Sequence, residues 1–351
     1  MAEEDLGLLA QTPPLEEFYT DARLVWALCI GNALGAVAHG VGIALTVGLT
    51  WCTQYELPMF TITSNLTTPG DPPRYLGNGI NVTRFKPVLE ECCPLDPRGI
   101  IVGFFALSFS FHVVFALVLL CGRPQDRDGS HRGRFVAVVA RWYLRCLADC
   151  RAPWRWLEYA FSASLLISLA VRLLGTGHVE LLWTLTQLMA TTIFFGYLTE
   201  IYGVQYIVTV PEDEQLNFFG WKLRRVWKPK TLVRRVQIHL LGYVPYISCW
   251  YVLLHQYETT RVRLQDDFPE FLPQAVWGSF VAFTLFGLVQ LFSQLDWGAL
   301  RYGPSLYWLG ELTYVILSFA AKANMGFVVL FDVLLSDRFD DLLYLKRTST
   351  C

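Results

Sequence analysis

The sequence predicts an all-α membrane protein with seven transmembrane helices, and its composition and hydropathy pattern support this fold class. Hydrophobic residues make up 54% of the 351 residues and charged residues only 17%, whereas a typical soluble domain carries about 25% charged residues. The mean hydropathy is +0.37. Apolar runs long enough to cross a bilayer as helices alternate with short polar segments. The net charge of −2 therefore carries little information about partners, and a multi-pass membrane location is expected.

The seven predicted spans follow from a hydropathy window of about 19 residues. They cover 24–51, 99–121, 156–175, 179–199, 237–256, 273–294 and 306–334. Only Gly175-Thr176-Gly177-His178 separates the third span from the fourth, and this turn chemistry favours two helices over one very long helix. The helical domain thus covers 24–334, between a polar N-terminal segment (1–23) and a C-terminal tail (335–351). The N-terminal segment lacks the features of a signal peptide, so we expect the first span to stay in the mature protein.

Basic residues in the loops predict the orientation in the membrane. The loops 122–153 and 200–236 hold seven Lys or Arg each, and the longer loop 52–98 holds four. Because Lys and Arg collect on the cytoplasmic side, the N-terminus is predicted to be cytoplasmic and the C-terminus extracellular. Two glycosylation sequons, at Asn65 and Asn81, agree with an outer position for the loop 52–98.

The outer loop also contains a β-like stretch and three cysteines. Met59-Phe60-Thr61-Ile62-Thr63 reads as a short strand. Cys52 begins the loop, and Cys92 and Cys93 lie near its end. In an oxidising compartment we expect one disulfide between Cys52 and one of the pair; the alternative is that all three are free or palmitoylated.

Lys322 is the only lysine inside a predicted span, near the middle of the seventh. Ionisable groups in the membrane are costly and mark functional sites, and a buried amine forms a Schiff base readily with an aldehyde. Glu158 in the third span lies at a depth that differs from that of Lys322 by roughly 7 Å, at 1.5 Å rise per residue. The two side chains could therefore pair. A structural ion pair or an ion-pathway role for Lys322 is the alternative.

Other polar residues lie on neighbouring spans. Ser318 is one helical turn before Lys322, and His39 and His112 lie in the first and second spans. A single intramembrane histidine is usually a packing residue, but two beside a Lys–Glu pair point to a polar network.

Two segments resemble the motifs of the heliorhodopsin family. Arg155-Trp156-Leu157-Glu158-Tyr159, followed by Ser162 and Ser164, is similar to the third-helix motif, and Leu317-Ser318-Phe319-Ala320-Ala321-Lys322 is similar to the retinal-lysine motif. Further similarities are Asn32 and His39, His112, Phe195-Gly196-Tyr197-Leu198-Thr199-Glu200, Val244-Pro245-Tyr246, and Val276-Trp277-Gly278 with Gln294. The resemblance implies a seven-helix rhodopsin-like bundle with inverted topology. The longer first and second loops and the tail suggest a eukaryotic or eukaryotic-virus member.

The resemblance also implies a cofactor and residue roles. Retinal, all-trans in the dark, would form a Schiff base on Lys322, with Glu158 as the counterion. The network around the Schiff base would contain Ser318, His39, His112, Tyr159, Arg155 and Asn32. The retinal pocket would be lined by Phe161, Ser162, Met189, Thr192, Tyr246, Trp277 and Phe280. Met189 and Thr192 depart from the family pattern, so the absorption maximum does not follow from it. Homodimerisation is a further expectation from the family.

The predicted function is light sensing without pumping. An outward pump needs a second acid on the third helix, but Ser168, Leu169 and Ala170 stand there. A slow conformational signal through the cytoplasmic loops to a partner protein is expected instead.

Two alternatives remain at this stage. The first is a light-activated proton channel that uses Glu200, Asp296, Glu311 and the histidines, although these acids could equally be interfacial residues that face water. The second is a scaffold or transporter with no light response. The sequence shows no nucleophile–base arrangement, phosphate-binding loop, metal-ligand cluster or nucleic-acid surface, so an enzyme is not expected.

Overall fold

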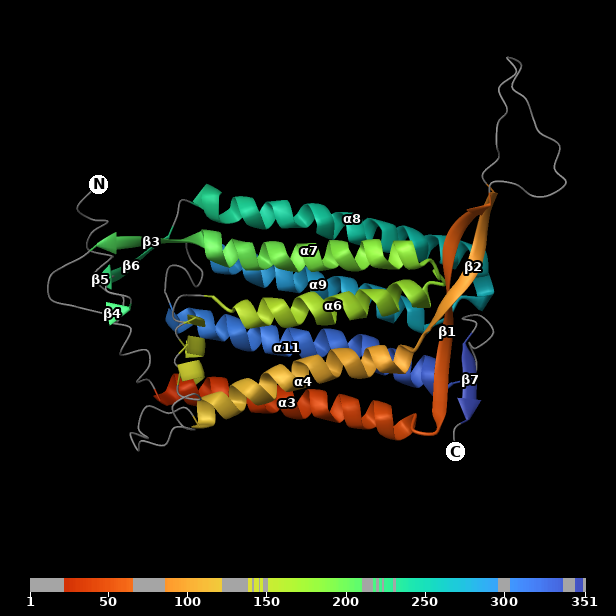
Figure 1. The fold of residues 1–351 in the computed structure, drawn as a ribbon, viewed down its shortest axis with the longest axis horizontal. Coiled ribbons are helices and arrows are strands. Elements are labelled where there is room, and N and C mark those ends of the chain that lie inside the picture. The colour runs from red at the N-terminus through yellow and green to blue at the C-terminus, as the bar shows by residue number, and fades with distance from the viewer. Residues whose placement is uncertain are drawn as a thin grey trace, which may run out of the picture.

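The computed structural model describes residues 22–65, 86–121, 138–140, 142–144, 146–147, 151–209, 217–218, 221–222, 224–229, 232–295, 304–336 and 345–349. In this part of the chain, seven helices of at least 21 residues lie side by side (Figure 1). They are α3 (Ala22–Leu49), α4 (Pro97–Cys121), α6 (Pro153–Leu173), α7 (Val179–Gly203), α8 (Leu232–Leu264), α9 (Phe271–Gln294) and α11 (Pro304–Val328). A π-helical segment, η3 (Val329–Leu334), continues α11, and a 3₁₀ turn, η2 (Gln265–Asp267), follows α8.

Six of the described helices are long and apolar enough to cross a membrane, which makes the chain a multi-pass membrane protein. The helix outside this set is α8, which carries Arg234 in its first turn and Arg261 and Arg263 in its last. It nevertheless packs along α7 and α9 within the bundle (Figure 1).

The break between α6 and α7 is confirmed. α6 ends at Leu173, and Gly175 adopts a positive φ of 80°, a conformation that glycine accepts without the steric cost of a Cβ atom. Its N–H donates to the carbonyl of Arg172 at 3.0 Å. The chain therefore reverses before α7 starts at Val179, as the turn residues predicted.

A small sheet covers one end of the bundle (Figure 1). It consists of β1 (Thr53–Asn65), β2 (Lys86–Leu95) and β7 (Lys346–Ser349) in the order β2-β1-β7, with both pairs antiparallel. Side chains fasten it to the helices: Arg172 donates to the carbonyl of Pro58 at 3.1 Å, and the Tyr55 hydroxyl donates to that of Leu334 at 2.9 Å. The strand in the tail, β7, was not predicted.

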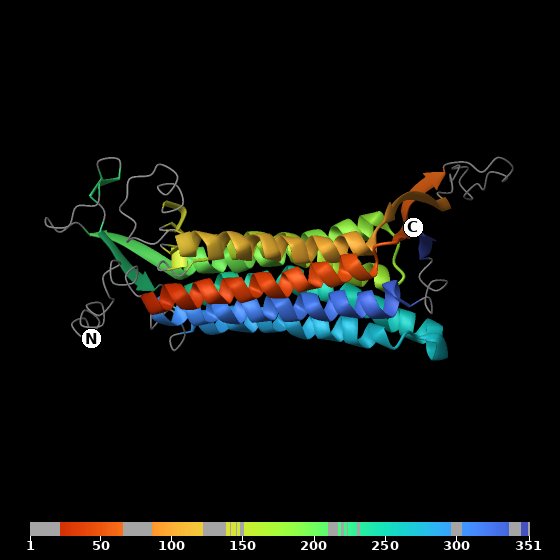
Figure 2. The same ribbon diagram turned by 90° about the horizontal axis from the view of Figure 1, so that it is seen from below.

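At the opposite end of the bundle, the predicted loop 200–236 contains two further strand pairs (Figures 1 and 2). β3 (Val204–Thr209) pairs antiparallel with β6 (Arg224–Pro229), and β4 (Asn217–Phe218) with β5 (Trp221–Lys222). The β-branched residues of β3 are the sequence signal that could have predicted a strand there.

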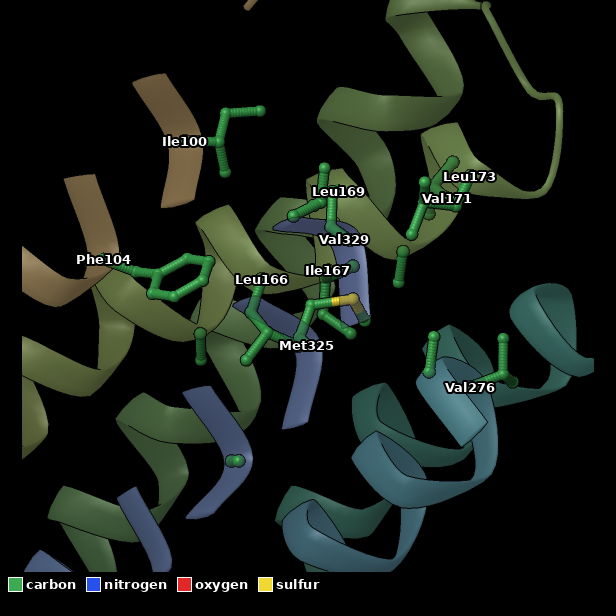
Figure 3. Close-up of a cluster of buried hydrophobic side chains, with 14 of the residues drawn as sticks. Ile100, Phe104, Leu166, Ile167, Leu169, Val171, Leu173, Val276, Met325 and Val329 are labelled. Carbon is green, nitrogen blue, oxygen red and sulfur yellow. The ribbon is translucent and has the colours of Figure 1, made fainter. Parts of the chain in front are cut away.

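The packed core surrounds α6 in the half of the bundle nearer the small sheet. Leu166, Ile167 and Leu169 of this helix are at most 1% exposed, and Phe104 of α4 and Met325 of α11 close around them (Figure 3). α6 is thus the central helix, and this position holds the side chains of its other half inside the bundle.

The predicted disulfide is wrong in its pairing. Cys52 is disulfide-bonded, but Cys92 and Cys93 are both free, with their Sγ atoms 3.0 Å apart. The strand register explains this, because Cys93 lies opposite Met59. Met59 is seven residues after Cys52, so at 3.3 Å per residue Cys93 lies about 23 Å along the strand from Cys52. Of the two sequons, Asn65 is the last residue of β1, and Asn81 lies outside the described residues.

Candidate functional site

The centre of the site is an ion pair between Lys322 of α11 and Glu158 of α6. The Lys322 Nζ lies 3.1 Å from the Glu158 Oε1, and the two residues are only 4% and 5% exposed. Lys322 also donates to the Ser318 Oγ at 2.6 Å, and its Nζ lies 5.4 Å from the centre of the Tyr159 ring. The extended lysine side chain bridges the predicted difference in depth, so the structure brings these four predicted residues together.

Glu158 has a second partner that the sequence reasoning missed. The Ser108 Oγ, on α4, donates to the same Oε1 atom at 2.5 Å, and Ser108 is 1% exposed. The sequence contained a signal for this role: Ser108 precedes His112 by four residues, so the two side chains lie on the same face of their helix.

The two histidines lie together between α3 and α4. Their rings stack with centroids 5.5 Å apart, and a His112 ring nitrogen lies 3.0 Å from the Asn32 Oδ1. His39 is fully buried against Phe105 and Phe319, and among the described residues neither of its ring nitrogens has a hydrogen-bond partner. A cavity lined by Asn32, Ser108, His112 and Glu158, among others, connects His112 to the carboxylate.

Arg155 joins three helices one turn before Glu158. Its guanidinium contacts the carboxylates of Glu200 on α7 and Glu311 on α11, and it lies 3.9 Å from the centre of the Tyr314 ring. Glu200 also accepts a bond from the Ala152 N–H at 3.0 Å. Both acids are therefore buried in an ion-pair cluster, and the alternative that they face water is wrong for them. Asp296 lies outside the described residues.

An elongated slot begins at Lys322. Its first part is lined by Tyr159, Ser162, Ala163, Leu166, Ile193, Phe283, Phe286, Ser318, Ala321 and Lys322. Its second part extends between α6, α7, α8 and α9. The two parts share Ile193, Phe283 and Phe286. The walls of the slot are mostly apolar and one end is a lysine, so the slot suits an elongated apolar aldehyde.

Four of the seven predicted pocket residues line the slot: Ser162, Met189, Thr192 and Tyr246. Phe280 instead packs edge-to-face against Trp250 and stacks on Tyr246, while Phe161 and Trp277 are 59% and 43% exposed. Phe161 and Trp277 are thus wrong predictions. At about 100° per residue, Ser162 lies about 40° from Glu158 around the helix axis and Phe161 about 60° in the opposite direction, on the side where α6 is exposed.

Residues that the sequence reasoning did not assign to the slot include Phe283 and Phe286, which follow Phe280 at helical spacing and were open to the same argument. Among the described residues, no group of three or more His, Cys, Asp or Glu could hold a metal ion.

In a comparison with known protein families, the family model described as Heliorhodopsin matches residues 132–334, which is more than half of the chain and includes Glu158 and Lys322. No curated protein matches this sequence. Since α3 and α4 precede the matched region, the assignments of His39, His112 and Ser108 depend on the geometry described above.

Proposed function

The chain belongs to the heliorhodopsin family, and from that membership we propose that it is a light sensor that binds retinal on Lys322. The observation that carries the residue assignment is the enclosed Lys322–Glu158 pair at the start of an apolar slot. Retinal held on the lysine nitrogen as a protonated Schiff base, all-trans in the dark, would supply light absorption and a change of shape on isomerisation.

Glu158 would serve as the single counterion. Its Oε1 lies 3.1 Å from the lysine nitrogen, and among the described residues no other acid forms an ion pair with Lys322. A buried positive charge requires such a partner, because burial without one is very costly. Ser108 and Ser318 hold the pair in place through hydrogen bonds to the carboxylate and the lysine nitrogen.

The proton-handling groups favour sensing over pumping. His39 and His112 lie within the same polar region as Glu158, so a proton leaving the lysine nitrogen has acceptors inside the bundle. Ser168, Leu169 and Ala170 provide no second carboxylate towards the other end of α6. The proton therefore stays inside, and the altered charge distribution would drive a slow conformational signal to a partner at the cytoplasmic loops.

The topology belongs to the same proposal. α8 would be the seventh span, which places the N-terminus in the cytoplasm and the small sheet with the C-terminus outside. The loops 122–153 and 200–236 hold more Lys and Arg than the loop 52–98, which supports this orientation. Homodimerisation and glycosylation at Asn65 and Asn81 are expected with it.

The test is an absorption spectrum of the purified protein expressed with all-trans retinal, beside Lys322→Ala and Glu158→Gln. We expect a visible band that is absent in Lys322→Ala and shifted to longer wavelength in Glu158→Gln, because the neutral amide no longer stabilises the positive charge on the lysine nitrogen. No band in the folded wild type would reject the sensor and favour a scaffold or transporter with a buried ion pair.

A light-activated proton channel is the second candidate. The cavity beside Glu158 also includes Arg155, Glu311 and residues as far as Arg151, so polar groups extend from the ion pair towards the inner end. A light-evoked current in voltage-clamped cells that disappears in Glu311→Gln would favour the channel, and a pigment without current would favour the sensor.

A further inference from the structure

The second part of the slot contains buried polar groups that the proposed function does not use. The Trp156 Nε1, the Gln290 Nε2 and the His239 Nε2 all belong to residues that line it. The three residues are 6%, 2% and 7% exposed, and none of these atoms has a hydrogen-bond partner among the described residues. Buried polar groups normally have partners, so three unpaired groups around one cavity require an explanation.

These groups lie at the end of the slot that is remote from Lys322. The Tyr314 hydroxyl donates to the Gln290 Oε1 at 2.8 Å, and Tyr314 lies eight residues from Lys322 on α11, about 12 Å at 1.5 Å per residue. Phe283 and Phe286 line both parts of the slot. A long ligand fastened at Lys322 would therefore have its far end near the polar groups.

Glycines keep this end open. A Cβ atom on Gly242 would lie 2.8 Å from the Phe195 Cβ, and one on Gly287 would lie 2.9 Å from the Tyr243 hydroxyl. Both glycines line the cavity. Their lack of a side chain lets α8 and α9 approach their neighbours while leaving volume between them.

The chemistry of the unpaired groups defines the ligand. An indole N–H and an amide NH₂ are donors only, so together they need an acceptor. We propose that this end of the slot is a subsite for an oxygen atom on the ring of the chromophore, and that the chain prefers a retinal with a ring keto group over unsubstituted retinal. This inference depends on the proposed function, since it requires that Lys322 hold a retinal.

The test compares pigment formation by the apoprotein with all-trans retinal and with its ring-keto analogue at equal concentrations. We expect tighter binding of the keto analogue by roughly three- to tenfold, the effect of one hydrogen bond. Gln290→Leu and Trp156→Phe should each bring this ratio close to one. Gln187→Leu is the matched control, because Gln187 is exposed on the outside of α7 and its loss should leave the preference unchanged.

The outcomes separate the two proposals. A pigment with plain retinal but no preference for the keto analogue would overturn the subsite, leave the light sensor intact, and indicate that water alone satisfies the donors. A preference that persists in both Gln290→Leu and Trp156→Phe would also overturn it. No pigment with either aldehyde would reject the light sensor itself.

Discussion

Glu158 is held between two hydrogen-bonding groups on different helices. Its Oε1 receives the Ser108 hydroxyl at 2.5 Å and lies 3.1 Å from the Lys322 nitrogen. A carboxylate that shares its charge with a hydroxyl donor attracts a nearby cation less strongly. Ser108 therefore tunes the interaction between Glu158 and the charge on the lysine.

Ser108→Ala should shift the visible band to shorter wavelength. Without the hydroxyl, the carboxylate charge acts more fully on the lysine nitrogen and stabilises the dark state, so the shift is opposite in sign to that of Glu158→Gln. Absorption spectra of the two purified variants measure it. Ser110→Ala, an exposed position on the same helix, is the control, and an equal shift there would contradict the role of Ser108.

At the scale of the elements, α6 is the central helix, and Arg155 joins it to α7 and α11. The guanidinium contacts Glu200 and Glu311, and all three side chains are at least 88% buried. Removing one member of such a cluster leaves uncompensated charge in a region of low dielectric constant, which costs more than the pair contributes when complete.

Arg155→Gln should lower the free energy of unfolding by about 3–5 kcal/mol, because two buried carboxylates lose their cation. Thermal denaturation in detergent, followed by the visible band or by circular dichroism, measures the change. The triple variant Arg155→Gln, Glu200→Gln, Glu311→Gln should recover most of the loss. If the triple variant were as unstable as the single one, buried charge would not be the cause.

At the scale of the whole molecule, the two ends of the bundle differ. One end holds the sheet β2-β1-β7, and the other holds the paired strands of the basic segment between α7 and α8. The number of spans decides how these ends relate to the two sides of the membrane. Six spans would place both termini on one side, and seven would place them on opposite sides.

We expect an N-terminal epitope tag to be accessible only after permeabilisation of the cell and a C-terminal tag to be accessible in intact cells. The physical reason is that α8, although more polar at its ends, packs against α7 and α9 as a full member of the bundle. Immunofluorescence with and without detergent measures this. Tags on the same side would show that α8 does not cross.

Much of the fold could be predicted from local pattern. The helix positions follow from apolar runs because hydrophobic length is a local property, and each predicted span falls on a helix, although α8 continues eight residues beyond the predicted end at 256. The turn at Gly175 was equally readable, since glycine is suited to a positive φ. β7 and its pairing with β1 could not be predicted, because strand pairing joins residues almost 300 positions apart.

For the candidate site, too, some features could be predicted from the sequence and others required the structure. The sequence by itself determined that the chain is a multi-pass membrane protein of the heliorhodopsin type with one lysine in mid-span and an acid, Glu158, within its reach, because charge inside an apolar run is visible without a structure. Only the tertiary structure decided that Ser108 binds Glu158, that Arg155 encloses Glu200 and Glu311, and that Phe161 and Trp277 face away from the slot. The physical reason is that contacts between helices depend on the rotation of each helix about its axis, which packing of the whole bundle sets.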